Sequence, residues 1–151
     1  MKRLLIALVG MCQIVSAQAY LGGNTASVEA DRVQMKAQQA ARMTQSFSGA
    51  YTVHETTLPT GTIVRQYVSK ADQVFAVTWS GPFKPDLRRL LGVYFDTMVA
   101  RQAGQVHVGR PFVSQHAPDL VVESGGHPRS FFGRAYLPGA IPTGVTPAEI
   151  Q

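Results

Sequence analysis

The strongest periodic pattern in the chain lies between residues 86 and 101. Apolar side chains recur there at spacings of three, four and seven residues, which is the spacing of one face of an α-helix. These apolar positions are Leu87, Leu90, Leu91, Tyr94, Phe95, Met98 and Val99. Gly92 interrupts them at a cost of about 1 kcal/mol relative to alanine, so we expect a packing reason for it. The pattern predicts one strongly amphipathic helix from Asp86 to about Arg101 that covers a sheet.

Other segments have the period or composition of β-strands. The first three are residues 51–57, 62–69 and 73–79. Short turns separate them, so we expect antiparallel neighbours in a meander. The third is almost wholly apolar, which is typical of a central strand buried on both faces. After the helix, residues 120–123 and 129–136 predict a hairpin linked by the glycine-containing segment 124–128.

The two ends of the domain are predicted to be less central. A helix capped by Ser27 and reaching about Met43 is poor in large apolar residues, so we expect it to be peripheral. Residues 138–151 contain three prolines and two glycines and predict an extended tail on the surface. The predicted fold class is therefore α+β. It has an antiparallel β-meander of about five strands packed against one strongly amphipathic helix, plus a peripheral N-terminal helix, in a single domain over residues 20–137.

The first 19 residues have the organisation of a secretory signal peptide. Lys2 and Arg3 form a positive region, and residues 4–12 form an apolar run. That run is shorter than the roughly 20 apolar residues that span a bilayer. Small residues precede the expected cleavage site between Ala19 and Tyr20. The mature protein is therefore expected to be periplasmic or secreted.

Cys12 is the one cysteine of the chain and lies inside this segment. A lipoprotein anchor at Cys12 is disfavoured, since Met11 stands where a small residue is needed. Cleavage leaves no cysteine for a disulfide, a thiolate nucleophile or a metal. No later segment predicts a transmembrane anchor in the mature chain. The net charge is +5, but the arginines are dispersed, so we expect no nucleic-acid partner.

Motifs that carry catalysis or metal binding are not recognised. The chain has four histidines, His54, His107, His116 and His127. None forms a ligand-spaced pair, and His54 and Glu55 point to opposite faces of their predicted strand, so we expect no metal and no cofactor. A carboxylate pair for glycoside chemistry stays open. The acids considered for it are Glu55, Asp96, Asp119 and Glu123.

The best candidate polar surface is the predicted turn around His127 and Arg129. It places a titratable ring and a guanidinium group on one exposed tip. The alternative is that Gly125 and Gly126 merely form the turn. Trp79 could stack on a sugar or a lipid, but a core aromatic at a strand end is the interpretation we favour.

Several short motifs together resemble a known family. The most specific are Trp79-Ser80-Gly81-Pro82 and Pro85-Asp86-Leu87. Gly125-Gly126-His127 and residues 133–138 complete them. Their order resembles a family of small exported proteobacterial proteins catalogued as a domain of unknown function. The resemblance implies a single domain in a Gram-negative envelope setting and carries no catalytic residue.

These observations favour a non-enzymatic periplasmic or secreted binding or interaction module. Its partner would be an envelope protein or ligand of unknown identity. The alternative is a small periplasmic hydrolase that uses His127 or a carboxylate pair. A third class is a structural part of a surface assembly.

The signal peptide gives the first testable prediction. Exported protein should begin at Tyr20, because the small residues before it match the specificity of signal peptidase. The intact mass of the exported chain measures this directly. A chain that retains residues 1–19, or one that carries lipid on Cys12, would contradict the prediction.

Overall fold

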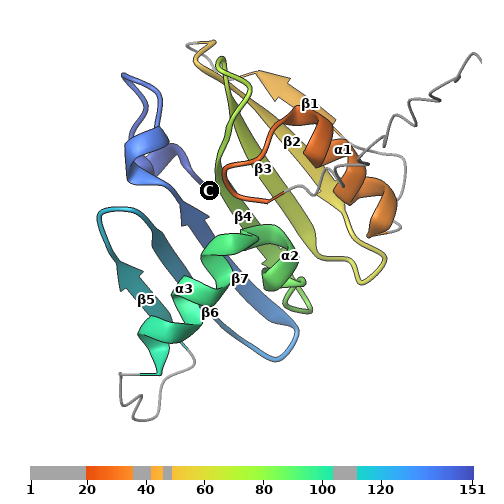
Figure 1. Ribbon diagram of the computed structural model, residues 1–151. Coiled ribbons are helices and arrows are strands. Elements are labelled where there is room, and N and C mark those ends of the chain that lie inside the picture. The colour runs from red at the N-terminus through yellow and green to blue at the C-terminus, as the bar shows by residue number, and fades with distance from the viewer. Residues whose placement is uncertain (1–19, 36–41, 46–48, 104–111) are drawn as a thin grey trace, which may run out of the picture.

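The computed structural model describes residues 20–35, 42–45, 49–103 and 112–151. Their strands form one antiparallel sheet in the order β1-β2-β3-β4-β7-β6-β5 (Figure 1). The strands are β1 (Arg42–Gln45), β2 (Tyr51–Thr57), β3 (Ile63–Ser69), β4 (Val74–Gly81), β5 (Val113–His116), β6 (Val121–His127) and β7 (Ser130–Tyr136). The helices are α1 (Thr25–Gln34), α2 (Leu87–Leu91) and α3 (Val93–Gln102). The predicted α+β class with a meander is confirmed, and the short edge strands β1 and β5 extend the sheet to seven strands.

Residues 1–19, with the predicted signal peptide and Ala19, lie outside the described residues. Tyr20 is the first residue that the structure describes, and its ring lies against Gly92. No helix within the described ranges is both long enough and apolar enough to cross a membrane.

Strand β4 is the centre of the sheet. It pairs with β3 on one side and with β7 on the other. Its residues from Val74 to Trp79 are all buried, as the apolar composition of this strand predicted. The predicted strand 51–57 coincides with β2, and the predictions for β3 and β4 are close to the observed bounds. A strand of this kind needs cover on both faces of the sheet.

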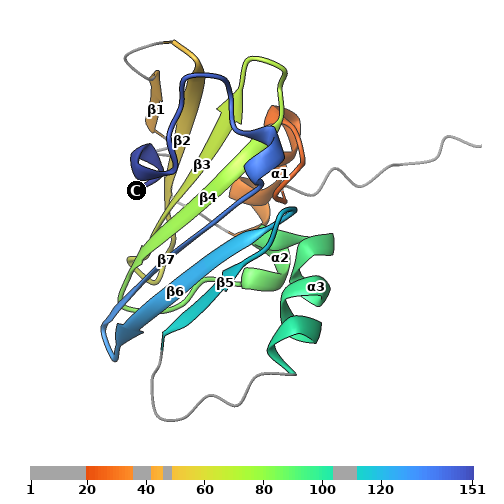
Figure 2. The same ribbon diagram turned by 90° about the vertical axis from the view of Figure 1, so that its left-hand side faces the viewer.

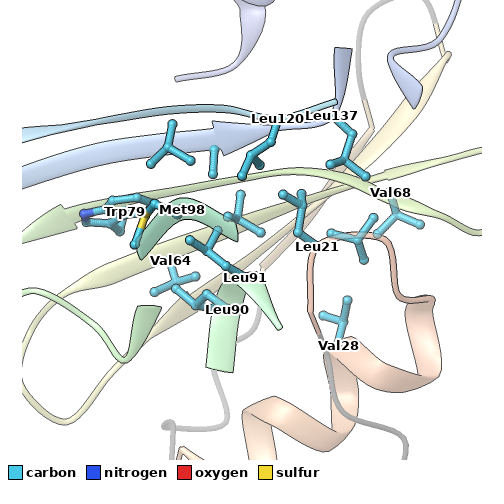
Figure 3. Packing of buried hydrophobic residues seen from close by; sticks show 14 of the residues in the cluster. Leu21, Val28, Val64, Val68, Trp79, Leu90, Leu91, Met98, Leu120 and Leu137 are labelled. Atoms are coloured by element: carbon cyan, nitrogen blue, oxygen red, sulfur yellow. The ribbon is translucent and has the colours of Figure 1, made fainter. Parts of the chain in front are cut away.

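The helices supply that cover on one face (Figure 2). Leu90, Leu91 and Met98 pack with Val77 and Trp79 in one buried cluster (Figure 3). The other buried members are Leu21, Val28, Leu58, Val64, Val68, Val74, Leu120, Val122, Ala135 and Leu137. The residues around Leu90 therefore lie where a sheet-covering segment was predicted.

The prediction of one continuous helix from Asp86 to Arg101 is wrong. The chain divides at Gly92, whose φ of +54° lies in the left-handed region that favours glycine. Tyr20 is the packing reason, since a Cβ on Gly92 would lie 2.5 Å from the Tyr20 Cβ. Beyond Gly92 the predicted apolar face is kept in part. Met98 is buried and Tyr94 and Phe95 pack against the same cluster, whereas Val99 is 43% exposed.

The predicted helix from Ser27 to Met43 is also wrong in its bounds. It begins at Thr25, and Asn24 caps it by accepting the Ser27 backbone N–H at 2.9 Å. It ends at Gln34. Residues 42–45 instead form β1, which pairs with β2, because their backbone groups complete the edge of the sheet.

The segment that leads into α1 belongs to the core, whereas Val33 towards the end of the helix is 64% exposed. Leu21 and Val28 are buried in the cluster under the helices. The backbone N–H of Gly22 donates to the Val74 carbonyl at 2.7 Å, and the Val74 N–H donates to the Gly23 carbonyl at 2.8 Å. These bonds tie the segment to the start of β4.

The predicted hairpin of β6 and β7 is confirmed, but its turn is shorter than expected. Residues 124–127 belong to β6, and the turn consists of Pro128 and Arg129. Arg129 adopts a φ of +71°. Gly126 lies within the strand, and this position needs glycine because a Cβ there would come 2.1 Å from the carbonyl oxygen of Ser130. The glycines therefore mark a close approach and not the turn itself.

The C-terminal residues return across the face opposite the helices (Figure 2). Val145 and Ile150 are buried there against a cluster of aromatic rings. Those rings are Tyr51, Tyr67 and Phe75, with centroids 5.7–6.1 Å apart. Residues 138–151, predicted as an extended tail, contain two short 3-10 turns, Pro138–Ala140 and Pro147–Glu149. This segment covers part of the second face of β4.

Truncation of Leu91 tests whether the helices stabilise the core. Leu91 is 0% exposed, so Leu91→Ala should lower the free energy of unfolding by about 2–5 kcal/mol. Arg88 has a side chain that is 68% exposed, and Arg88→Ala should cost less than about 1 kcal/mol. Thermal and chemical denaturation of both variants measures the difference. A Leu91→Ala variant as stable as the wild type would show that this face is not a core.

Candidate functional site

A row of polar side chains crosses the face of the sheet opposite the helices. We call this the open face, and the row consists of Glu55, Arg65, Thr78, Arg134 and Glu123. Each member is the direct register partner of the next, on β2, β3, β4, β7 and β6 in turn. Because successive residues of a strand point to opposite faces, the register places all five side chains on one face. The row has Thr78 at its centre and a carboxylate at each end.

Each arginine of the row forms an ion pair with the glutamate on its outer side. Arg65 Nε donates to Glu55 Oε2 at 2.7 Å, and Arg134 Nε donates to Glu123 Oε2 at 2.6 Å. His116, on β5, lies with Nε2 3.0 Å from Glu123 Oε1. The hydrogen bond from Arg134 lowers the pKa of Glu123 and outweighs partial burial, which acts in the opposite direction. Glu123 is therefore held as a carboxylate.

The C-terminal segment is fastened to the same row. Arg134 Nη1 donates to the carbonyl oxygens of Pro147 at 2.9 Å and Ile150 at 3.3 Å. The Tyr67 hydroxyl donates to the Gln151 carbonyl at 2.5 Å and accepts the Gln151 backbone N–H at 3.1 Å. These bonds place Ile150 and Gln151 beside Thr78 and Arg134, where they line the same pocket.

A pocket with a volume of about 320 Å³ lies over the centre of this row. Its lining residues are Arg65, Thr78, Trp79, Ser80, Phe112, Glu123, Phe132, Gly133, Arg134, Ile150 and Gln151. This volume is at the low end of the range of about 300–1,000 Å³ that small-molecule sites occupy. Apolar groups around a few polar groups are typical of such sites.

Two exposed phenylalanines stand at this pocket. Phe112 is 48% exposed and Phe132 is 52% exposed. Gly125 lies beneath both rings, since a Cβ there would lie 2.7 Å from Phe112 Cδ2 and 3.2 Å from Phe132 Cζ. The glycine therefore allows the Phe112 ring to lie directly against β6.

On the open face of the pocket, Thr78 and Arg65 have polar atoms that are unused among the residues that the structure describes. A third lining residue with such an atom is Trp79, through Nε1, but its side chain packs in the cluster under the helices. Thr78 is 4% exposed, and its hydroxyl has no hydrogen-bond partner in the described part of the chain. Arg65 uses Nε for Glu55, while its two terminal nitrogens make no hydrogen bond within the described ranges. A buried polar group without a partner costs about 1–3 kcal/mol, so Thr78 requires an explanation.

The predicted polar surface lies away from this pocket. His127 and Arg129 are exposed at the β6–β7 turn, and neither lines the pocket. His127 Nδ1 lies 3.1 Å from the Pro128 carbonyl oxygen. The assignment of a binding role to these two residues stays a prediction.

The candidate carboxylates are separated into arginine pairs. Glu55 and Glu123 share the open face, at opposite ends of the row. Asp96 and Asp119 pair with Arg88 at 3.1 Å and with Arg101 at 2.9 Å. Within the described ranges no group of three histidine, cysteine or acidic side chains lies close enough to hold a metal ion.

Sequence reasoning missed the residues at the centre of the site. Arg65 was visible as a charged residue on the same strand face as Ile63 and Tyr67, both apolar or aromatic. An arginine between apolar residues on one strand face indicates a polar partner nearby, because burial of a charge requires a partner. Thr78 carried no signal, since its neighbours across the strands depend on register.

The Glu123–Arg134 pair predicts a pH-dependent stability. Glu123→Gln should lower the free energy of unfolding at pH 7 by about 1 kcal/mol, since it removes a partly exposed charge-assisted bond. The folded-state pKa of Glu123 is lowered. Its stabilisation is therefore present above the unfolded pKa of about 4.3 and is lost as the pH falls through the folded value. Denaturation between about pH 3 and pH 7 should show the difference shrinking towards acid, and a constant difference would contradict this.

Comparison with known proteins gives a family but no function. No curated protein matches the chain, and no solved structure matches it. The family model described as "Protein of unknown function (DUF2844)" matches residues 17–150, which span nearly the whole chain. The match includes every strand and helix that the structure describes. The chain therefore belongs to the DUF2844 family of proteins of unknown function.

Proposed function

We propose that this protein is an exported, non-enzymatic binding module and that the pocket on the open face holds its ligand. The signal-peptide pattern of residues 1–19 supports a periplasmic or secreted location. The pocket is the observation that carries the proposal. It combines exposed aromatic rings with a buried hydroxyl and an arginine whose terminal nitrogens make no hydrogen bond within the described part of the chain.

The acids support binding in preference to hydrolysis. A carboxyl group that acts as a general acid needs a raised pKa, whereas the hydrogen bond from Arg134 lowers the pKa of Glu123. Glu55 and Glu123 both accept hydrogen bonds from arginines. They therefore serve as anchors for the guanidinium groups that flank Thr78.

A small periplasmic hydrolase is the competing proposal. His127, the histidine considered for it, lies outside the pocket. His116 does not line the pocket either, but its ring lies with Nε2 3.0 Å from Oε1 of Glu123, which does. A hydrolase would need this ring to act on a bound substrate, so turnover assays belong in the same experiment.

A variant that fills the pocket tests the proposal. Ser80 lines the pocket and is exposed, so Ser80→Phe should place a ring in the binding volume without disturbing the core. Ser130→Phe is the matched control, since Ser130 is exposed on the neighbouring β7 and outside the pocket. The probe is 8-anilinonaphthalene-1-sulfonate, whose fluorescence rises in apolar sites.

The wild type and Ser130→Phe should bind one probe per chain, and Ser80→Phe should bind at least tenfold more weakly. Native mass spectrometry of the exported protein should show a co-purified small molecule that Ser80→Phe lacks. Equal probe binding by all three proteins would overturn the assignment of the pocket. Turnover of esterase, phosphatase or glycosidase substrates that is lost in Ser80→Phe or His127→Ala would overturn the non-enzymatic part.

A further inference from the structure

On the open face, most of the free hydrogen-bonding capacity of the pocket lies at two adjacent residues. Arg65 and Thr78 are register partners on β3 and β4. The Thr78 hydroxyl has no partner among the described residues, and the terminal nitrogens of Arg65 have none there either. Both groups donate hydrogen bonds, and both line the pocket.

The other charged groups of the pocket are mostly occupied, since within the described ranges only Nη2 of Arg134 is left without a hydrogen bond. Glu123 accepts hydrogen bonds from Arg134 at 2.6 Å and lies 3.0 Å from His116 Nε2. Arg134 also donates to the carbonyls of Pro147 and Ile150. A ligand would therefore find most of its open partners at Arg65 and Thr78. Those partners require an acceptor on the ligand.

The remainder of the pocket favours an apolar body. Phe112, Phe132 and Ile150 line it, and the two rings are about half exposed. Aromatic rings gain from stacked or edge-to-face contact with another ring, by about 0.5–1.5 kcal/mol per pair. The volume of about 320 Å³ limits the ligand to a small molecule.

We propose that the pocket binds a small aromatic carboxylic acid, with its carboxylate on Arg65 and Thr78 and its ring among Phe112, Phe132 and Ile150. This inference rests on the proposed function of the pocket. A guanidinium group binds a carboxylate through two parallel N–H bonds, and a threonine hydroxyl adds a third donor. Glu55 holds Nε of Arg65 and leaves the terminal nitrogens of the fork for the ligand.

A matched pair of probes tests the head group. 4-Phenylbutyrate and 4-phenylbutanamide have the same body and differ in the carboxylate. Isothermal titration calorimetry at pH 7 should show that the purified exported protein binds the acid at least tenfold more tightly than the amide. Arg65→Gln and Thr78→Val remove the two proposed donors. Arg32→Gln is the control, because Arg32 pairs with Glu29 on α1 and lies outside the pocket.

Arg65→Gln should weaken binding of the acid tenfold or more and leave binding of the amide within twofold. Thr78→Val should weaken the acid about threefold, and Arg32→Gln should change neither probe. Equal binding of the acid and the amide, both lost in Ser80→Phe, would overturn this inference and leave the pocket as a binding site. Binding of 8-anilinonaphthalene-1-sulfonate without binding of either phenyl probe would likewise overturn this inference and leave the pocket as a binding site. If each of the three probes bound Ser80→Phe as tightly as the wild type, the assignment of the pocket as a binding site would be overturned.

Discussion

The burial of strand β4 on both faces is the constraint on which the rest of the fold depends. Residues 74–79 are all buried, and a sheet strand of this kind has no face that water covers. The two faces are covered by different means. Helices α2 and α3 and the segment around Leu21 cover one face, while Val145 and Ile150 from the C-terminal segment cover the other. The helices form the larger cluster, and the C-terminal cover stops beside Thr78, where the pocket lies.

The row Glu55–Arg65–Thr78–Arg134–Glu123 explains why a pocket can exist there. Two guanidinium groups on either side of Thr78 repel each other in a partly buried setting. Arg65 donates to Glu55 at 2.7 Å, and Arg134 donates to Glu123 at 2.6 Å. Each glutamate therefore attracts its arginine away from Thr78. The order of charges across the strands thus directs each guanidinium group towards a carboxylate and not towards the other guanidinium group. The same pairs compensate the burial of the charges.

The fold was more predictable than the site, and particular residues show why. The strand pattern predicted β2, β3 and β4 because half-buried strands alternate and a central strand is wholly apolar. The division at Gly92 was missed since its cause, the ring of Tyr20, is distant in sequence. The site was missed because its residues come together only through the pairing register of neighbouring strands. Arg65 was visible within one strand, but Thr78 became significant only when β3 and β7 placed an arginine on each side of it.

The two arginines of the row are equivalent in sequence pattern and different in use. Arg134 is drawn into the fold, since it donates to Glu123 and to two carbonyls of the C-terminal segment. Pro147 lies in a short 3-10 turn and Ile150 directly follows it, so neither carbonyl pairs within the sheet, and the Pro147 carbonyl also accepts the backbone N–H of Ile150. Arg65 lies one strand beyond Thr78, on the side where its terminal nitrogens meet no such carbonyl among the described residues. The path of the C-terminal segment thus decides which arginine stabilises the protein and which one retains donors at the pocket.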